Sequence, residues 1–218
     1  MRILFIAKRG ESSVDAAISF CRERGAEVDV FLHDWGESIP EACLRWTGDL
    51  IVCYLARWIL PASLLDAASL AAINFHPASP EYPGVGCNNM ALYDEVDEFG
   101  VTCHHMAAKV DSGPIVAVRR FPVAENDTVA SLLERTYAEL AVLFRGVMAP
   151  VLAGEGLPAS SETWGDRLFT RRDLQELERI TPDMETDEIR RRVRATTFGS
   201  WRPYVELGGF RFEVVDPD

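Results

Sequence analysis

The order of apolar runs near the start of the chain constrains its fold most strongly. Residues 3–7 form a continuous apolar run of strand length, and residues 28–32 read as a second strand. Between them, apolar side chains recur at helical spacing: Val14, Ala17, Ile18 and Cys21. Strand, helix and strand in this order predict a right-handed parallel crossover, the unit of doubly wound sheets. We therefore expect an α/β fold with a mostly parallel sheet.

Later apolar runs extend this sheet. We expect further strands at 48–54, 71–76, 100–106 and 115–121. Helices are expected at 61–68, at 88–93, and from Asp127 or Thr128 to about residue 150. The sequence thus predicts one α/β domain over residues 1–154.

Composition excludes several classes of protein. The 218 residues carry a formal net charge of −12, so the chain as a whole repels nucleic acid and anionic lipid. No apolar stretch is long enough for a membrane helix, and the apolar amino terminus is too short for a signal peptide. The five cysteines are scattered without CxxC spacing, which argues against a disulfide framework or a zinc site. We expect a reduced, cytoplasmic protein that binds no nucleic acid and no membrane.

The turn after the first strand carries no dinucleotide fingerprint. It reads Ala7-Lys8-Arg9-Gly10, without the GxGxxG pattern. A nicotinamide or flavin enzyme is therefore disfavoured. The turn after the third strand, which contains Trp58, faces the ligand crevice of such a sheet, so its backbone and indole could meet a planar cofactor. Packing of Trp58 against a helix is the alternative.

Polar side chains follow the fourth expected strand. Asn74 and His76 are two residues apart and so leave the same face of the strand. A loop rich in proline and glycine follows, and Asp111 lies in a second turn-rich segment, Val110-Asp111-Ser112-Gly113-Pro114. Imidazole, carboxamide and carboxylate together can accept a proton, stabilise an oxyanion and orient the base. This trio suits direct acyl transfer to an amine.

Each of these residues also has a structural interpretation. The histidine could be a core residue, the aspartate a turn residue, and the asparagine a partner of its neighbours. Metal binding by His76, His104, His105 and Asp111 is another alternative. Since His104 and His105 are adjacent on a strand and point to opposite faces, at most one of them can join the site. We expect no metal.

The sequence pattern changes after residue 157. A polar connection leads to two charged helices, expected at 171–180 and 185–195, and a β-hairpin turns at Gly208-Gly209. We expect residues 155–218 to form a small C-terminal extension of helices and a hairpin. Four arginines between residues 190 and 194 are either a solvated helix face or a phosphate clamp.

Four motifs in the central stretch resemble the formyltransferases that use 10-formyltetrahydrofolate. They are Asn74-Phe75-His76-Pro77, Tyr82-Pro83-Gly84, Gly100-Val101-Thr102 with His104, and Asp111-Ser112-Gly113-Pro114-Ile115. The resemblance is close between residues 50 and 121 and loose elsewhere. It implies a Rossmann-like core and 10-formyltetrahydrofolate as co-substrate.

The resemblance also implies roles for single residues. The catalytic residues would be Asn74, His76 and Asp111: His76 as general base, Asn74 holding the carbonyl oxygen, and Asp111 orienting His76. The folate would be bound by Arg57, Trp58, Leu60, Met106 and Val110. The second substrate would be bound by Tyr82, Gly84, Asn88, Asn89, His104 and Arg194.

The extension and the loop at 84–89 look most like enzymes that formylate a nucleotide-linked deoxyamino sugar for surface polysaccharide such as O-antigen. Those enzymes commonly pair into homodimers. Formylation of glycinamide ribonucleotide, hydrolysis of 10-formyltetrahydrofolate, and folate or nucleotide binding without catalysis are the alternatives. The nucleotide, the sugar, the position of its amine and the dimer interface stay open.

Overall fold

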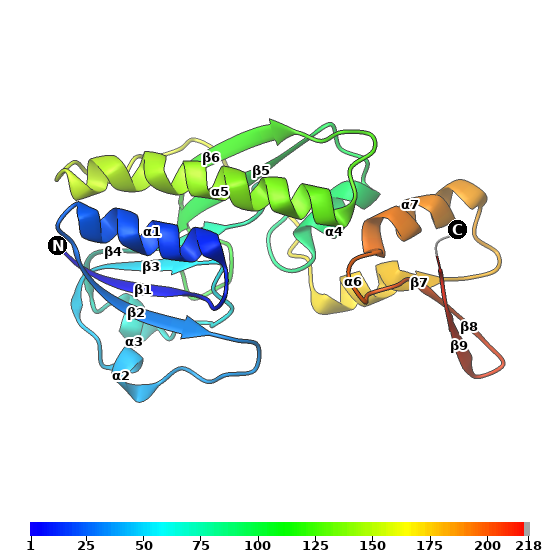
Figure 1. Ribbon diagram of the computed structural model, residues 1–218, viewed down its shortest axis with the longest axis horizontal. Coiled ribbons are helices and arrows are strands. Elements are labelled where there is room, and N and C mark those ends of the chain that lie inside the picture. The colour runs from blue at the N-terminus through cyan, green and yellow to red at the C-terminus, as the bar shows by residue number, and fades with distance from the viewer. Residues whose placement is uncertain (216–218) are drawn as a thin grey trace.

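The computed structural model describes residues 1–215, so the last three residues of the expected extension lie outside the described part. Its main feature is a six-stranded sheet at the centre of the larger lobe (Figure 1). The strands lie in the order β2 (Glu27–His33), β1 (Arg2–Lys8), β3 (Gly48–Tyr54), β4 (Ala68–His76), β5 (Glu98–His105) and β6 (Ile115–Pro122). The expected α/β fold with a mostly parallel sheet is confirmed.

Strand direction changes twice within this sheet, at β5 and again at β6. β2, β1, β3 and β4 are parallel, whereas β5 pairs antiparallel with β4 and β6 antiparallel with β5. The carboxyl ends of the four parallel strands therefore meet at one edge, where ligands bind in open α/β sheets. His76 is the last residue of β4 at this edge.

Helices cover both faces of the sheet. α1 (Ser12–Glu23) and α5 (Val129–Leu152) contribute to the larger core, in which Phe144 packs among the rings of Phe5, Tyr54 and Phe75. α2 (Glu41–Leu44) and α3 (Ala62–Leu65) contribute to a smaller core on the other face. We call these the α5 face and the α3 face of the sheet.

Local sequence signals explain where the longest helix begins and ends. Thr128 caps α5 by accepting the N–H of Ser131, whose hydroxyl accepts the N–H of Thr128 in return. The helix ends at Leu152, and Gly154 follows with φ of +89°, a conformation that glycine adopts without strain.

Some element boundaries differ from expectation. The helix expected at 61–68 is the single turn α3, because β4 already begins at Ala68 beside Gly48. The helix expected at 171–180 ends at Glu178, because Arg179 and Ile180 pair with β8 and form the short strand β7. The helix α2 was not expected. In each case tertiary pairing or packing overrides the local pattern.

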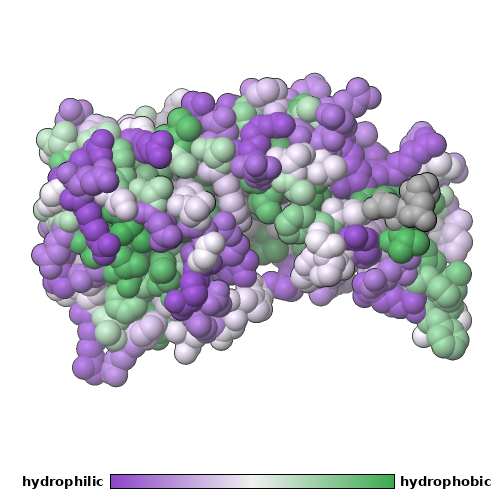
Figure 2. All heavy atoms as spheres, in the orientation of Figure 1, coloured by the Kyte–Doolittle hydropathy of each residue, from purple (hydrophilic) through white to green (hydrophobic). Residues whose placement is uncertain are grey.

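The C-terminal extension forms a smaller lobe at the right of Figure 1. It contains α6 (Arg171–Glu178), β7 (Arg179–Ile180), α7 (Thr186–Thr196), β8 (Tyr204–Leu207) and β9 (Phe210–Glu213), with the strands in the order β7-β8-β9. The expected hairpin is present, and Gly208 and Gly209 both have positive φ. Figure 2 shows apolar side chains gathered over this hairpin, where Phe210 is 71% exposed.

α4 (Cys87–Tyr93) joins the two lobes. It packs against α7, where the hydroxyl of Tyr93 donates to Glu188. The extension is thus held against the segment that follows β4. Among residues 1–215, no helix combines the length and apolarity that crossing a bilayer requires.

Candidate active site

Strand alternation sets the direction of the first two candidate residues. Ile73 and Phe75 of β4 enter the core on the α5 face, whereas Ala72 enters the core on the α3 face. Because side chains alternate along a strand, Asn74 and His76 leave on the same side as Ala72. Both side chains therefore stand on the α3 face, at the carboxyl edge of the sheet.

Asp111 reaches these residues from the connection between β5 and β6. Its backbone has φ of +43°, which is uncommon for a residue with a side chain. Its Oδ2 lies 3.5 Å from Nδ1 of His76, and its Oδ1 lies 3.3 Å from Nε2 of His104. Oδ2 also accepts the N–H of Gly84 at 2.9 Å. One buried carboxylate thus joins two imidazoles and the loop after β4.

Gly113 allows the Asp111 turn to lie against β5. A Cβ atom on Gly113 would lie 1.9 Å from the carbonyl oxygen of His105, so only glycine fits there. The turn can therefore approach the end of β5 closely. This approach brings Asp111 to His104.

The carboxyl group of Asp111 stays ionised although it is buried. Burial by itself raises its pKa, but the charge of His76, the hydrogen bond and charge of His104, and the N–H of Gly84 together lower the pKa to about 2. The cluster therefore holds one buried negative charge beside two imidazole rings.

Each nitrogen of His76 faces an acceptor. Nε2 lies 3.1 Å from the carbonyl oxygen of Tyr82, and Nδ1 faces Asp111. When the ring takes up a proton, both N–H groups therefore have a partner. The thiol of Cys87 lies 3.8 Å from Nε2 and donates to the carbonyl of Gly84. The ring of His76 is thus held in place through both of its nitrogens.

His104 connects Asn74 to the carboxylate. Its Nδ1 lies 2.8 Å from the carbonyl oxygen of His105, which assigns an N–H to Nδ1. Nε2 then faces the amide nitrogen of Asn74 at 3.1 Å. Asn74, His104, Asp111 and His76 form one chain of contacts, which we call the four-residue cluster. Within it His76 is 5% exposed and His104 only 2%.

The two adjacent histidines of β5 separate as expected. His104 is buried in the four-residue cluster, whereas His105 is partly exposed. Burial, and after it the charge of His104, lower the pKa of His105. No group of three or more His, Cys, Asp or Glu side chains within residues 1–215 is arranged to hold a metal ion.

Three of the residues expected at the folate site gather on the α3 face. Leu60 is buried in its core, and Trp58 and Met106 pack against that core. This places an apolar surface on the same face of the sheet as Asn74 and His76. Val110 is exposed at the end of the loop that follows Met106.

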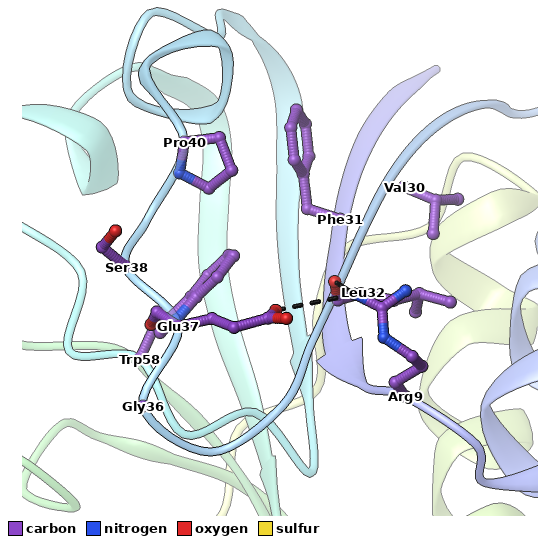
Figure 3. Close-up of a pocket in the computed structure, with 9 residues that line it drawn as sticks. All are labelled: Arg9, Val30, Phe31, Leu32, Gly36, Glu37, Ser38, Pro40 and Trp58. Carbon is purple, nitrogen blue, oxygen red and sulfur yellow. Dashed lines mark hydrogen bonds and ion pairs between the residues drawn. The ribbon is translucent and has the colours of Figure 1, made fainter.

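The turn after β3 is held by a histidine of β2. His33 stacks on Trp58 with ring centroids 4.1 Å apart, and its Nε2 accepts the N–H of Arg57. Burial lowers the pKa of His33, which keeps this nitrogen free to accept. Trp58 also lines a cavity of about 780 Å³ beside Phe31, Glu37 and Arg9 (Figure 3). This cavity lies next to the expected folate turn and does not include the four-residue cluster.

Four of the expected substrate residues use their side chains elsewhere. The hydroxyl of Tyr82 donates to Asp94, the amide of Asn88 to Thr136 and that of Asn89 to the carbonyl of Ala195. Arg194 donates to the carbonyls of Asp127 and Ala124. The structure does not bring these side chains to the four-residue cluster, whereas Gly84 and His104 are part of it or bonded to it.

Three of the four arginines between residues 190 and 194 on α7 form ion pairs. Arg191 and Arg192 both bond to Glu188, and Arg190 bonds to Asp187. Arg192 additionally donates to the carbonyls of Glu176 and Arg179. These contacts favour the structural interpretation of the run over a phosphate clamp.

Trp164 is a site residue that sequence reasoning missed. Its indole ring lies edge-to-face with His104, at 4.9 Å between centroids, and near His76 at 6.0 Å. A single tryptophan in a polar connection carries no periodic or motif signal, and its partners lie far away in the chain. Only the fold reveals the contact.

Comparison with known proteins identifies relatives of this chain. A methionyl-tRNA formyltransferase of Listeria monocytogenes is 30% identical over 141 residues, which are 64% of this chain and 45% of that protein. The chain thus spans less than half the length of this curated relative. A sugar N-formyltransferase from Shewanella superposes over 98% of this chain and 96% of its own, with a TM-score of 0.81 and 17% identity.

A second solved structure is an N-formyltransferase from Helicobacter canadensis in complex with folinic acid and dTDP-3-aminofucose. It covers 96% of this chain and 85% of its own, with a TM-score of 0.75 and 18% identity. At such identities the two structures establish the fold alone. Residues 37–145, half of the chain, match the formyl transferase family, and this stretch holds every member of the four-residue cluster. The chain therefore belongs to the formyl transferase family.

Proposed function

We propose that this protein transfers the formyl group of 10-formyltetrahydrofolate to the amino group of a nucleotide-linked deoxyamino sugar. The observation that carries the proposal is the four-residue cluster at the carboxyl edge of the sheet. It combines a base that can hold a proton, an ionised carboxylate and a carboxamide, and it offers no serine nucleophile. The amine of the substrate would itself attack the formyl carbon.

The proposed reaction has two steps. The amine attacks the formyl carbon, its excess proton passes to His76, and the amide of Asn74 donates a hydrogen bond to the resulting oxyanion. The bond from the formyl carbon to N10 of the folate then breaks, and the proton returns from His76 to N10. Asp111 stays ionised and balances the charge of His76 while the proton is held.

The α3 face is the proposed position of the folate. Trp58, Leu60 and Met106 provide an apolar surface on the side of the sheet to which Asn74 and His76 point. A pterin bound on that surface would have its formyl group beside the cluster. The exposed Val110 and the loop after Met106 would then cover the ring.

The proposed anion-binding site is formed by two arginines around Trp35. The guanidinium groups of Arg57 and Arg171 lie 5.3 Å and 4.3 Å from the ring of exposed Trp35, and neither forms an ion pair with a carboxylate of residues 1–215. Arginine binds phosphate oxygens well, and an exposed indole can stack on a planar ring. Both properties suit a nucleotide.

Two observations favour an amino sugar over a tRNA as acceptor. A solved sugar N-formyltransferase superposes over 98% of this chain and 96% of its own, with a TM-score of 0.81. The net charge of −12 also opposes binding of a polyanion. We further propose that the protein acts in the cytoplasm, in surface polysaccharide assembly.

Incubation with 10-formyltetrahydrofolate and a panel of amine acceptors tests the proposal. The panel holds dTDP- and UDP-linked amino sugars, glycinamide ribonucleotide, and buffer without an acceptor. Formylation of an amino sugar nucleotide, read by mass spectrometry, is the expected result. Turnover of glycinamide ribonucleotide alone would favour purine synthesis, and release of formate without an acceptor would favour a hydrolase.

A further inference from the structure

The segment at 157–170, which connects α5 to α6, lies along the loop that follows β4. The N–H of Gly165 donates to the carbonyl of Pro80 at 2.9 Å, and that of Phe169 donates to the carbonyl of Pro83 at 2.9 Å. Both acceptors lie in the loop that follows β4. The segment is therefore held at two points along the loop that begins at His76.

Side chains strengthen this attachment. Arg120 of β6 binds both Glu81 of the loop and Glu162 of the segment, at 2.8 Å and 2.5 Å. Phe169 stacks on Tyr82 with ring centroids 5.6 Å apart. The segment thus has a fixed place over the loop, and Trp164 lies between the side-chain attachment at Glu162 and the backbone attachment at Gly165.

Trp164 contacts two rings of the four-residue cluster and the turn that carries its carboxylate. Its ring meets those of His104 and His76 at interplanar angles of 89° and 68°. Its Nε1–H donates to the carbonyl of Gly113 at 2.8 Å, in the turn that carries Asp111. One side chain therefore limits the rotation of both imidazoles and ties down the turn of the carboxylate.

We propose that Trp164 is a positioning residue for formyl transfer. This inference rests on the proposed function. The residue lies outside the region that matches the family, which ends at 145, so the extension takes part in forming the catalytic centre. Its contacts keep the rings of His76 and His104 in place beside the carboxylate of Asp111. Small displacements of reacting groups lower rates strongly, on the order of 100-fold for about 1 Å.

Two substitutions distinguish a positioning role of Trp164 from a contribution to the overall stability of the protein. Trp164→Ala removes both ring contacts and the bond to Gly113, and we expect kcat to fall ~10- to 100-fold while KM changes less than about 3-fold. Trp164→Phe keeps an aromatic ring and loses only the bond, so kcat falls about 2- to 10-fold. Thermal melting of each variant checks that it is folded.

Imidazole proton NMR gives a second readout that needs no substrate. The chain has only four histidines, and an indole shifts the resonances of a ring in contact with it. Both variants are expected to move the resonances of His76 and His104 and to leave that of His33 unchanged. Trp58→Phe is the reciprocal control, since Trp58 stacks on His33 and should move that resonance alone.

Unchanged kcat in folded Trp164→Ala, or a rise in KM alone, would overturn the inference. Unmoved resonances of His76 and His104 would do the same. If Trp164→Ala does not fold, Trp164→Phe decides, and wild-type kcat with wild-type resonances in that variant contradicts the proposal. Absence of formyl transfer in the wild type would contradict the proposed function, a result distinct from the NMR outcome.

Discussion

Oδ2 of Asp111 lies 3.5 Å from Nδ1 of His76, and its second oxygen lies 3.3 Å from Nε2 of His104. The carboxylate is only 9% exposed. Its two oxygens therefore face these two imidazoles and the N–H of Gly84. A buried charge that loses one of its partners destabilises a protein. The stability of the fold therefore depends on the positions of these partners in the site.

Asp111 makes the stability of the protein depend on pH. Burial raises the pKa of its carboxyl group, but the histidines and Gly84 lower it from 3.8 to about 2. Because the folded value is the lower one, the stabilisation is fully present above about pH 4 and is lost as the pH falls through about 2. The contribution is about 2 kcal/mol.

Asp111→Asn tests this relationship. Urea unfolding of the wild type and of the variant between about pH 5 and pH 2 is expected to show a difference that shrinks as the pH falls. A difference in unfolding free energy that does not change with pH would mean that the neighbours of Asp111 do not lower the pKa of its carboxyl group.

Gly113→Ala is expected to destabilise the protein by about 2–4 kcal/mol, because its Cβ would clash with the carbonyl of His105. Gly146→Ala is a matched control on the exposed surface of α5, where no atom lies within 4 Å of the added Cβ. There alanine is expected to stabilise by about 0.5–1 kcal/mol. Equal melting temperatures of the two variants would contradict the close approach at Gly113.

Arg194→Lys distinguishes the two interpretations of the arginine run. Its side chain donates to the carbonyls of Asp127 and Ala124, so we expect a loss of about 1 kcal/mol of stability with an unchanged KM for the sugar nucleotide. Arg190→Ala, which breaks an exposed pair with Asp187, should change neither. A raised KM without a loss of stability in Arg194→Lys would instead favour the phosphate clamp.

The hairpin is the proposed contact between two copies of the chain. Phe210 and Phe212 are 71% and 55% exposed, which is costly for a hairpin that stays in water. We expect a homodimer in sedimentation velocity, and Phe210→Ser with Phe212→Ser should yield monomers. Val142→Ser, on the exposed side of α5, should leave the assembly unchanged. A monomeric wild type would contradict this interface.

Much of the site follows from local rules. The two-residue spacing of Asn74 and His76 predicts a shared face on any strand, and β4 has that form. The parallel order of the first strands predicts the edge at which these residues emerge. The paired glycines at 208–209 predict the hairpin, because both positions need positive φ.

Contacts between distant parts of the chain could not be predicted in this way. Asn88 and Asn89 were expected to bind substrate, yet they lie in the first turn of α4 and their amides bond to α5 and α7. Trp164 reaches the histidines from a connection without any motif. Such pairings depend on how α4, α7 and the segment at 157–170 pack, which the local pattern does not encode.

Replacement of His76 tests the central claim most directly. For wild type and His76→Ala, formyl transfer is measured in single turnover, and folate binding by calorimetry. We predict that the variant loses at least about 100-fold in rate, because the proton of the amine has no acceptor, while folate affinity changes little. A rate in His76→Ala equal to that of the wild type would contradict the account.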